Sequence, residues 1–185
     1  MTVYFTASIV GKKNYLSQYL AIINHLKAKN YQVISDHIIN SNPRQIYTEK
    51  KEERIKFQNQ LEKWINSCDF MVAETSFPSI SVGYEISLAL QHNKPVLVLY
   101  SVGNPPSLLA QHKDENLDCE KYTPSTLPEI IDNFIKYVEG AADNRFTFFI
   151  TSEIASYLDK VAKKGKIPKS VYLRKLIEKE MKGKK

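Results

Sequence analysis

The sequence predicts an α/β protein built on a parallel sheet in three layers, with a small C-terminal appendage. Over about residues 1–140, short runs rich in β-branched and aromatic residues alternate with stretches of helical spacing. This alternation is typical of βαβ units, which form a flavodoxin/Rossmann-like sheet covered by helices on both faces. The composition agrees, because 43% of the 185 residues are apolar and 25% are charged, as in a globular protein.

The first half of this domain is expected to contain three strands and two long helices. "TVYFTASIV" is a β-branched and aromatic run that ends at small residues and Gly11, so it predicts a strand. A helix over residues 15–30 follows, with Leu16, Leu20, Ile23 and Leu26 at helical spacing and Asn30 as its stop. "YQVISDHI" predicts a second strand, residues 41–47 a loop, residues 48–67 a long polar helix, and "DFMVAET" a third strand.

The second half continues the alternation. Residues 78–81 predict a turn, "GYEISLALQHN" a helix, "PVLVLY" a buried strand and "LDCEKY" a short fifth strand. The last helix, residues 126–140, has Thr126 and Glu129 as a predicted capping box and Gly140 as its stop.

Several classes of protein are not expected. No apolar run approaches the ~20 residues of a membrane span, and the N-terminus lacks a basic region ahead of its apolar residues, as a signal peptide would have. Cys68 and Cys119 lack metal-ligand spacing and are expected to be reduced thiols of a cytoplasmic protein. The sequence therefore predicts no metal, no cofactor and no membrane partner.

Charge is distributed unevenly along the chain. Residues 141–185 contain 12 Lys/Arg and 5 Asp/Glu, whereas residues 1–140 contain 14 Lys/Arg and 15 Asp/Glu. The formal charge of +6 therefore arises in the C-terminal segment. This asymmetry indicates either an acidic partner such as nucleic acid or a solvated basic tail.

Polar residues gather in the loops that follow the predicted strands, which are residues 7–13, 36–41 and 75–85. In a parallel sheet these loops meet at the carboxyl edge, where ligands bind. Glu85 lies near the start of an apolar helix, with Ser79, Ser81 and Gly83 around it, and Ser8 and Gly11 occupy the first loop. A carboxylate in a first helical turn is also stabilised by the helix dipole alone. The serines and glycines favour an anionic or sugar ligand.

Three segments, "VYFTASIVG", "WINSCDFMVAETSFPSISVGYEISLAL" and "NKPVLVLY", resemble the nucleoside 2-deoxyribosyltransferase superfamily. The hydrolase branch that acts on 2'-deoxynucleoside 5'-phosphates is the most similar. The resemblance implies that Glu85 is a nucleophile at C1' of a deoxynucleoside or deoxynucleotide, and that Tyr4 orients it. It also implies that Ser8 and Ser79, with the backbone near Gly11, bind a 5'-phosphate. His37 either lines the same cleft or is a surface-loop histidine.

The sequence departs from this superfamily at three positions. The aspartate that handles the proton of the leaving base is replaced by Leu61, and the adjacent Glu62 points about 100° away around a helix. An arginine common in the hydrolase branch is Val10, although Lys12 and Lys13 follow. A phosphate-binding serine from the partner subunit falls at position 109, a leucine, with Ser107 nearby.

The C-terminal segment, residues 144–182, resembles ribbon-helix-helix DNA-binding proteins. Its predicted strand turns Phe146, Phe148 and Ile150 to one side, and two helices follow. The resemblance implies a homodimer whose ribbon enters the major groove. The residues implied to contact DNA are Arg145, Thr147 and Phe149 at the bases and Lys169 and Ser170 at the phosphates. An outward phenylalanine fits equally a segment that only dimerises.

Two functions follow from the sequence. One is cleavage or transfer at the N-glycosidic bond by a domain spanning residues 1–140, with Glu85 as nucleophile. The other is a nucleotide-sensing regulator that binds DNA through residues 144–182 and has little or no catalytic activity. The Glu85, Tyr4, Ser8 and Ser79 set favours the enzyme, whereas Leu61 and the basic tail favour the regulator.

Overall fold

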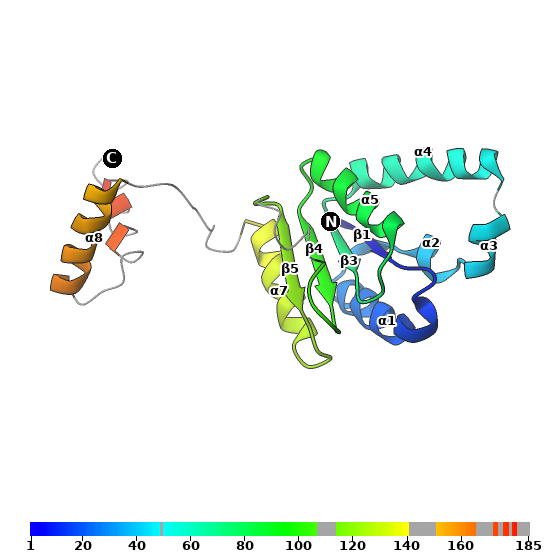
Figure 1. The fold of residues 1–185 in the computed structure, drawn as a ribbon, viewed down its shortest axis with the longest axis horizontal. Helices are drawn as coiled ribbons and strands as arrows, with labels where there is room; N and C mark the ends of the chain where they lie inside the picture. Colours follow the sequence, from blue (N-terminus) through cyan, green and yellow to red (C-terminus); the bar gives the residue numbers. More distant parts are fainter. Residues whose placement is uncertain are drawn as a thin grey trace. The chain divides into compact units, whose positions relative to one another are not determined.

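The computed structural model describes residues 1–48, 50–106, 114–140 and 151–165, together with residues 172–173, 176–177 and 179–180. The chain divides into two compact units, Met1–Asp143 and Asn144–Lys185. Within the described residues of the first unit, five parallel strands form one sheet in the order β2-β1-β3-β4-β5 (Figure 1). The strands are β1 (Thr2–Ala7), β2 (Gln32–Ile34), β3 (Phe70–Glu74), β4 (Val96–Tyr100) and β5 (Leu117–Lys121). The predicted parallel α/β fold is confirmed.

Helices cover both faces of this sheet. They are α1 (Lys12–Ala28), α2 (Asp36–Ile39), α3 (Pro43–Thr48), α4 (Lys51–Ser67), α5 (Ile80–Gln91) and α7 (Leu127–Val138). The cluster on one face joins α1 and α7 to alternate strand residues such as Val3, Phe5 and Val72. The cluster on the other face joins α4 and α5 to Tyr4, Met71 and Ala73. Successive strand residues thus supply opposite cores, as the two-residue period of a strand requires.

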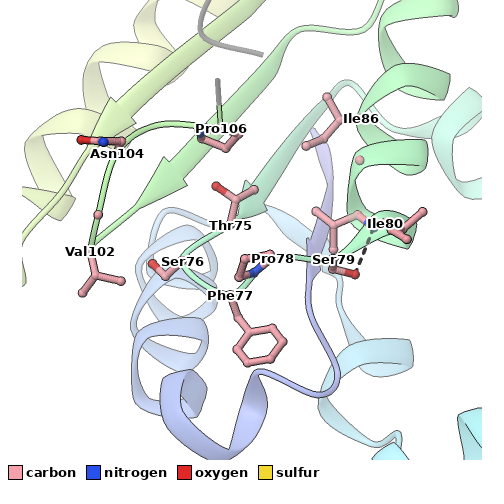
Figure 2. A pocket seen from close by; sticks show the side chains of 13 residues that line it. Thr75, Ser76, Phe77, Pro78, Ser79, Ile80, Ile86, Val102, Asn104 and Pro106 are labelled. Atoms are coloured by element: carbon pink, nitrogen blue, oxygen red, sulfur yellow. Dashed lines mark hydrogen bonds between the residues drawn. The ribbon is translucent and has the colours of Figure 1, made fainter. Parts of the chain in front are cut away.

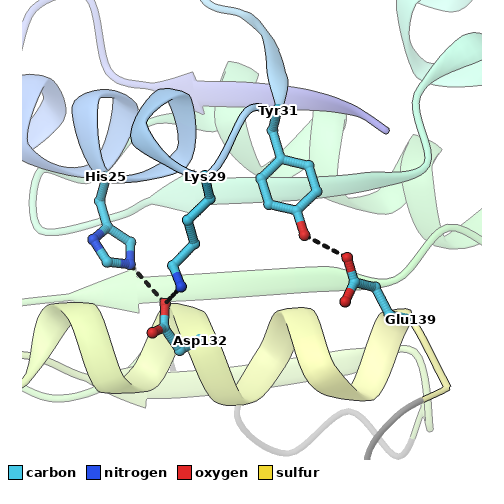
Figure 3. A network of polar contacts seen from close by, with 5 residues as sticks. All are labelled: His25, Lys29, Tyr31, Asp132 and Glu139. Carbon is cyan, nitrogen blue, oxygen red and sulfur yellow. Dashed lines mark hydrogen bonds and ion pairs between the residues drawn. The ribbon is translucent and has the colours of Figure 1, made fainter.

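Hydrogen bonds and an ion pair connect the α1 and α7 segments on one face of the sheet (Figure 3). Asp132 of α7 accepts from His25 at 2.7 Å and pairs with Lys29 at 2.9 Å. Tyr31 donates to Glu139 at 2.5 Å. These contacts join residues more than 100 positions apart, so they fix α7 against α1 and complete the layer.

The strand after α1 is shorter than predicted. The strand ends at Ile34, and Asp36–Ile39 turns into the short helix α2. The ammonium of Lys12 donates to the carbonyl oxygens of Ile39 and Ser41 at 2.6 and 2.7 Å. Carbonyls at a helix C-terminus lack intrahelical partners, so this lysine stabilises the turn from a distance of 27 residues.

Helix boundaries differ from the expectations at several points. Residues 43–47, expected as loop, belong to α3. The long helix expected from about Thr48 begins as α4 at Lys51, and α5 begins at Ile80 rather than at Gly83. The predicted capping box of the last helix is wrong, because the Thr126 hydroxyl makes no bond to the helix and accepts from the Thr123 amide at 2.9 Å. Gly140 has φ +67°, which agrees with its predicted role as a stop.

In the second unit, α8 (Ser152–Gly165) confirms the first predicted helix of the segment. Leu158 is buried, whereas Ile154 and Tyr157 are exposed. The predicted strand and the five residues predicted to contact DNA lie outside the described residues; these five are Arg145, Thr147, Phe149, Lys169 and Ser170. None of the described helices has the length and apolarity needed to cross a membrane.

Candidate active site

Glu85 lies on α5 at the carboxyl edge of the sheet, and only 5% of its surface is exposed. Because α5 begins at Ile80, Glu85 lies in the second turn and not in the first. Stabilisation of a first-turn carboxylate by the helix dipole therefore does not explain Glu85. Burial raises the pKa of its carboxyl group, and the neighbouring Thr6 and Tyr4 hydroxyls oppose that rise. A carboxyl group that faces the core in this way needs a specific reason to be there.

Tyr4 connects Glu85 to His37. Its hydroxyl donates to Glu85 Oε2 at 2.9 Å and lies 2.9 Å from His37 Nε2. Tyr4 is fully buried, and burial together with the Glu85 charge raises the pKa of its hydroxyl, which keeps it protonated. Because the Tyr4 proton goes to Glu85, the hydroxyl oxygen accepts from His37, and Nε2 carries the hydrogen. The three residues therefore form a directed chain that ends at the Glu85 carboxylate.

His37 is neutral and keeps one ring nitrogen without a bond. Burial lowers the pKa of its imidazole to about 4. Its Nδ1 atom is buried and has no hydrogen-bond partner within the described part of the chain. With the hydrogen on Nε2, Nδ1 is an acceptor. Within the described residues, His37 therefore carries an unused acceptor beside the Tyr4–Glu85 pair.

Aromatic rings from β1, α2 and α4 surround this chain. The His37 ring stacks on Tyr4 with centroids 5.0 Å apart, and its centroid lies 5.0 Å from that of Trp64 and 6.2 Å from that of Phe57. Phe57 and Trp64 meet edge to face at 6.2 Å. Sequence reasoning missed Phe57, which lies seven residues before Trp64 and so two turns away on the same helix face.

The loop after β1 is tightly built. Ser8 is buried, and its hydroxyl oxygen accepts from the Gly11 amide at 3.2 Å. A Cβ atom on Gly11 would lie 2.6 Å from the Cβ of Phe77, so only glycine permits this approach of the two loops. The Gly11 amide is already bound to Ser8, which leaves the Ser8 hydroxyl hydrogen as a donor in this loop.

The residues around the start of α5 divide into two groups. Ser79 is the N-cap, with its hydroxyl oxygen accepting from the Val82 amide at 3.5 Å (Figure 2). Ser79 and Gly83 line a cavity of about 610 Å³ between residues 75–83 and 102–106, which Glu85 does not line. Ser81 is exposed and lies one turn before Glu85 on α5, outside that cavity. Of the predicted ligand-binding residues Ser79, Ser81 and Gly83, only Ser79 and Gly83 therefore line the cavity.

Leu61 occupies the position at which the superfamily has an aspartate, and it is buried. Leu61 is 2% exposed and packs in the core between α4, α5 and the sheet. Glu62 is exposed and accepts from Gln58 at 3.2 Å. The α4 register therefore turns Glu62 away from Glu85, and Ser107 and position 109 lie outside the described residues.

Comparison with known proteins gives the family. No family profile matches the chain. A Syntrophotalea carbinolica protein with the assigned name 2'-deoxynucleoside 5'-phosphate N-hydrolase 1 is 37% identical over 103 residues, which is 56% of this chain and 70% of that protein. The chain belongs to the 2'-deoxynucleoside 5'-phosphate N-hydrolase family. A Nematostella vectensis member with the same assigned name is 29% identical over 136 residues, covering 71% of this chain and 92% of the relative.

A solved structure agrees with the N-hydrolase assignment at the level of the fold. The Clostridium botulinum CMP N-glycosidase BcmB aligns with a TM-score of 0.50 and 17% identity, over 71% of this chain and 99% of its own. Within the described residues, no group of three or more His, Cys, Asp or Glu side chains is arranged to hold a metal ion.

Proposed function

We propose that the chain cleaves the N-glycosidic bond of 2'-deoxynucleosides or their 5'-monophosphates, with Glu85 as the nucleophile. The observation that carries this proposal is the buried chain from His37 through Tyr4 to Glu85. Tyr4 holds one carboxylate oxygen, so the other is oriented for attack. Family membership supports the bond that is cleaved, and the names of the relatives support a 5'-monophosphate substrate.

The reaction has two displacements at C1'. Glu85 bonds to C1' while the C1'–N bond breaks and its electron pair goes to the base, which leaves a deoxyribosyl ester on the enzyme. Water then attacks C1', the ester bond breaks, and Glu85 is restored as a carboxylate. The proton that water loses balances the proton that the departed base takes up. Two inversions give net retention at C1'. Transfer to another base instead of water would use the same ester.

The base is proposed to stack against the aromatic rings next to His37. Phe57 and Trp64 present ring surface next to His37, whose Nδ1 is an unused acceptor within the described residues. Stacking of a base on an aromatic side chain is worth about 1–3 kcal/mol. A protonated ring nitrogen or an exocyclic amine of the base would donate to His37. Ser8 and Ser79 are proposed at the 5'-phosphate, on the loops that follow β1 and β3.

Chromatographic release of free base from a panel of deoxynucleosides and deoxynucleoside 5'-monophosphates tests this function. Wild-type protein is expected to release base from at least one substrate, and Glu85→Gln to release none. Glu62→Gln is the matched control, because it removes an exposed glutamate and should behave as wild type. Equal release from Glu85→Gln and wild type would exclude Glu85 as the nucleophile.

A second candidate is the regulator that senses a nucleotide and binds DNA. Leu61 in place of the acid and the net charge of +7 over residues 141–185 favour it. The exposed Ile154 and Tyr157 on α8 are consistent with a homodimer formed through this segment. A mobility-shift experiment on random duplex DNA at several salt concentrations, with Arg145→Ala and Lys169→Ala alongside, tests it. No shift at any salt concentration would leave dimerisation as the only proposed role of the segment.

A further inference from the structure

A second glutamate is buried at the same edge of the sheet. Glu74 is the last residue of β3, and its surface is 0% exposed. Strand alternation turns it with Phe70 and Val72 toward α1 and α7, on the opposite face from Glu85. Burial raises the pKa of its carboxyl group. A fully buried carboxyl group is tolerated only where hydrogen bonds or protonation offset the cost of desolvation.

One carboxylate oxygen of Glu74 collects three donors. Oε1 accepts from the Ser76 hydroxyl, from the Ser76 amide at 3.3 Å and from the Tyr122 hydroxyl at 3.1 Å. Oε2 has no partner within the described part of the chain. The bonds come from the loop after β3 and from the residue after β5, so Glu74 joins two segments that are distant in sequence.

The network continues to a third segment. The Ser76 hydroxyl oxygen accepts from the Ser101 amide at 2.8 Å and lies 2.8 Å from the Ser101 hydroxyl. Because the Ser76 proton goes to Glu74, the Ser101 hydroxyl must be the donor to Ser76. Every donor in the network thus points toward the Glu74 carboxylate, and the arrangement depends on an acceptor at that position.

The two loops that this network joins form the walls of the 610 Å³ cavity. Residues 75–80, 82, 83 and 86 line one side, and residues 102–104 and 106 line the other (Figure 2). Phe77, next to Ser76, packs on Gly11, and Ser79 opens α5 two residues later. A shift of Ser76 would therefore move the N-cap of α5 and the loop that follows β1 together.

We propose that Glu74 is a positioning residue whose carboxylate, through Ser76 and Ser101, locks the loops after β3 and β4 together and so sets the place of Ser79. The effect on the loops stands on the hydrogen bonds alone. The effect on substrate rests on the proposed function, because it assumes that Ser79 binds the 5'-phosphate.

Hydrogen exchange of the Ser101 amide in the full chain tests the effect on the loops. Ser101 bonds to Ser76 and not to Glu74, so its protection reports Glu74 only through position. Glu74→Leu is expected to accelerate exchange at Ser101 by about tenfold or more. Glu74→Gln keeps an acceptor oxygen and is expected to stay within about threefold of wild type. Unchanged protection in a folded Glu74→Leu protein would overturn the proposal.

Steady-state kinetics test the effect on substrate. Glu74→Leu is expected to raise KM for a deoxynucleoside 5'-monophosphate about tenfold, with little change in kcat or in KM for the corresponding nucleoside. Ser76→Ala removes the same link with a smaller change in the core and is expected to give the same pattern. It replaces Glu74→Leu as the test if that variant does not fold. An equal fall in kcat on both substrates would overturn the positioning of Ser79. If wild type releases no base, the proposed function fails, and the exchange of Ser101 still decides whether Glu74 locks the loops.

Discussion

Glu74 and Glu85 are the same residue type, buried near the same edge of one sheet, yet they serve opposite faces in different ways. Glu74 has no exposed surface, and three donors from the surrounding loops converge on one of its oxygens. Glu85 keeps a little exposed surface and accepts a hydrogen bond from Tyr4, which also contacts His37. Burial raises the pKa of both carboxyl groups.

The comparison teaches that burial and a raised pKa do not identify a catalytic carboxylate by themselves. The hydrogen-bond partners distinguish Glu74 from Glu85. The Glu74 donors hold loops in place, whereas the Glu85 donor also contacts a histidine that packs among aromatic rings and has an unused nitrogen within the described residues. We therefore assign positioning to one glutamate and chemistry to the other.

The largest expected difference is between the Gln variants of the two glutamates. Glu85→Gln removes the proposed nucleophile and is expected to lower kcat for base release by about 10⁴-fold or more. Glu74→Gln preserves an acceptor oxygen and should stay within about threefold of wild type. Thermal unfolding of both proteins controls for loss of fold. Similar losses in the two variants would break the distinction between them.

His37→Leu is expected to have the second largest effect. If the base donates a hydrogen bond to His37 Nδ1, loss of that buried acceptor is expected to lower kcat/KM by about 10- to 100-fold. Parallel assays with His25→Leu provide the control, since His25 is bound to Asp132 on the other face of the sheet. A His37→Leu enzyme as fast as wild type would leave the base without a partner among the described side chains.

Lys12→Met should have a moderate effect through His37. Lys12 holds the carbonyl oxygens at the end of α2, the helix that carries His37. Loss of these charge-assisted bonds is expected to lower kcat/KM about tenfold. Lys13→Met is the matched control, because Lys13 is exposed beside it. If both variants lose activity equally, the lysines act through general charge and not through α2.

The smallest expected effect is a shift in the pH dependence of Tyr4→Phe. Glu85 must be ionised to attack, so kcat falls as pH falls through its raised pKa. The Tyr4 hydroxyl bond favours the ionised form, and its loss raises that pKa further. The acid limb of the kcat profile is therefore expected to move to higher pH. A limb that stays in place would mean that Tyr4 does not stabilise the Glu85 carboxylate.

Much of the fold could be predicted because it depends on local patterns. All five strands fall within the segments predicted to form them, although β2 ends early. Hydrogen bonds connect Tyr4, His37 and Glu85, which the resemblance singled out. The start of α5 was misplaced, since Ser79 is its cap and the next residue, Ile80, is 95% exposed, against the apolar pattern of a packed helix. Leu16 and Leu20 share the apolar spacing of α1, yet each is 38% exposed.

The rest depends on contacts between distant segments. The Glu74 network joins the ends of three strands, and Lys12 bonds to carbonyls 27 and 29 residues away. Neither arrangement follows from the local sequence around any one residue. The sequence contains one indication of the Glu74 network. Glu74 is a charged residue at the end of the apolar run "FMVAE", and a buried carboxyl group needs hydrogen-bond partners.

The most direct test of the central claim is a search for the deoxyribosyl ester on Glu85. The protein is incubated with a deoxynucleoside 5'-monophosphate carrying fluorine at C2', which destabilises the oxocarbenium-like transition state and slows hydrolysis of the ester. The reaction is then quenched in acid and digested for mass spectrometry. We expect the peptide that contains Glu85 to gain one fluorodeoxyribosyl phosphate group, and the same peptide of Glu85→Gln to gain none. Stoichiometric release of base with no modified peptide would contradict a covalent mechanism through Glu85.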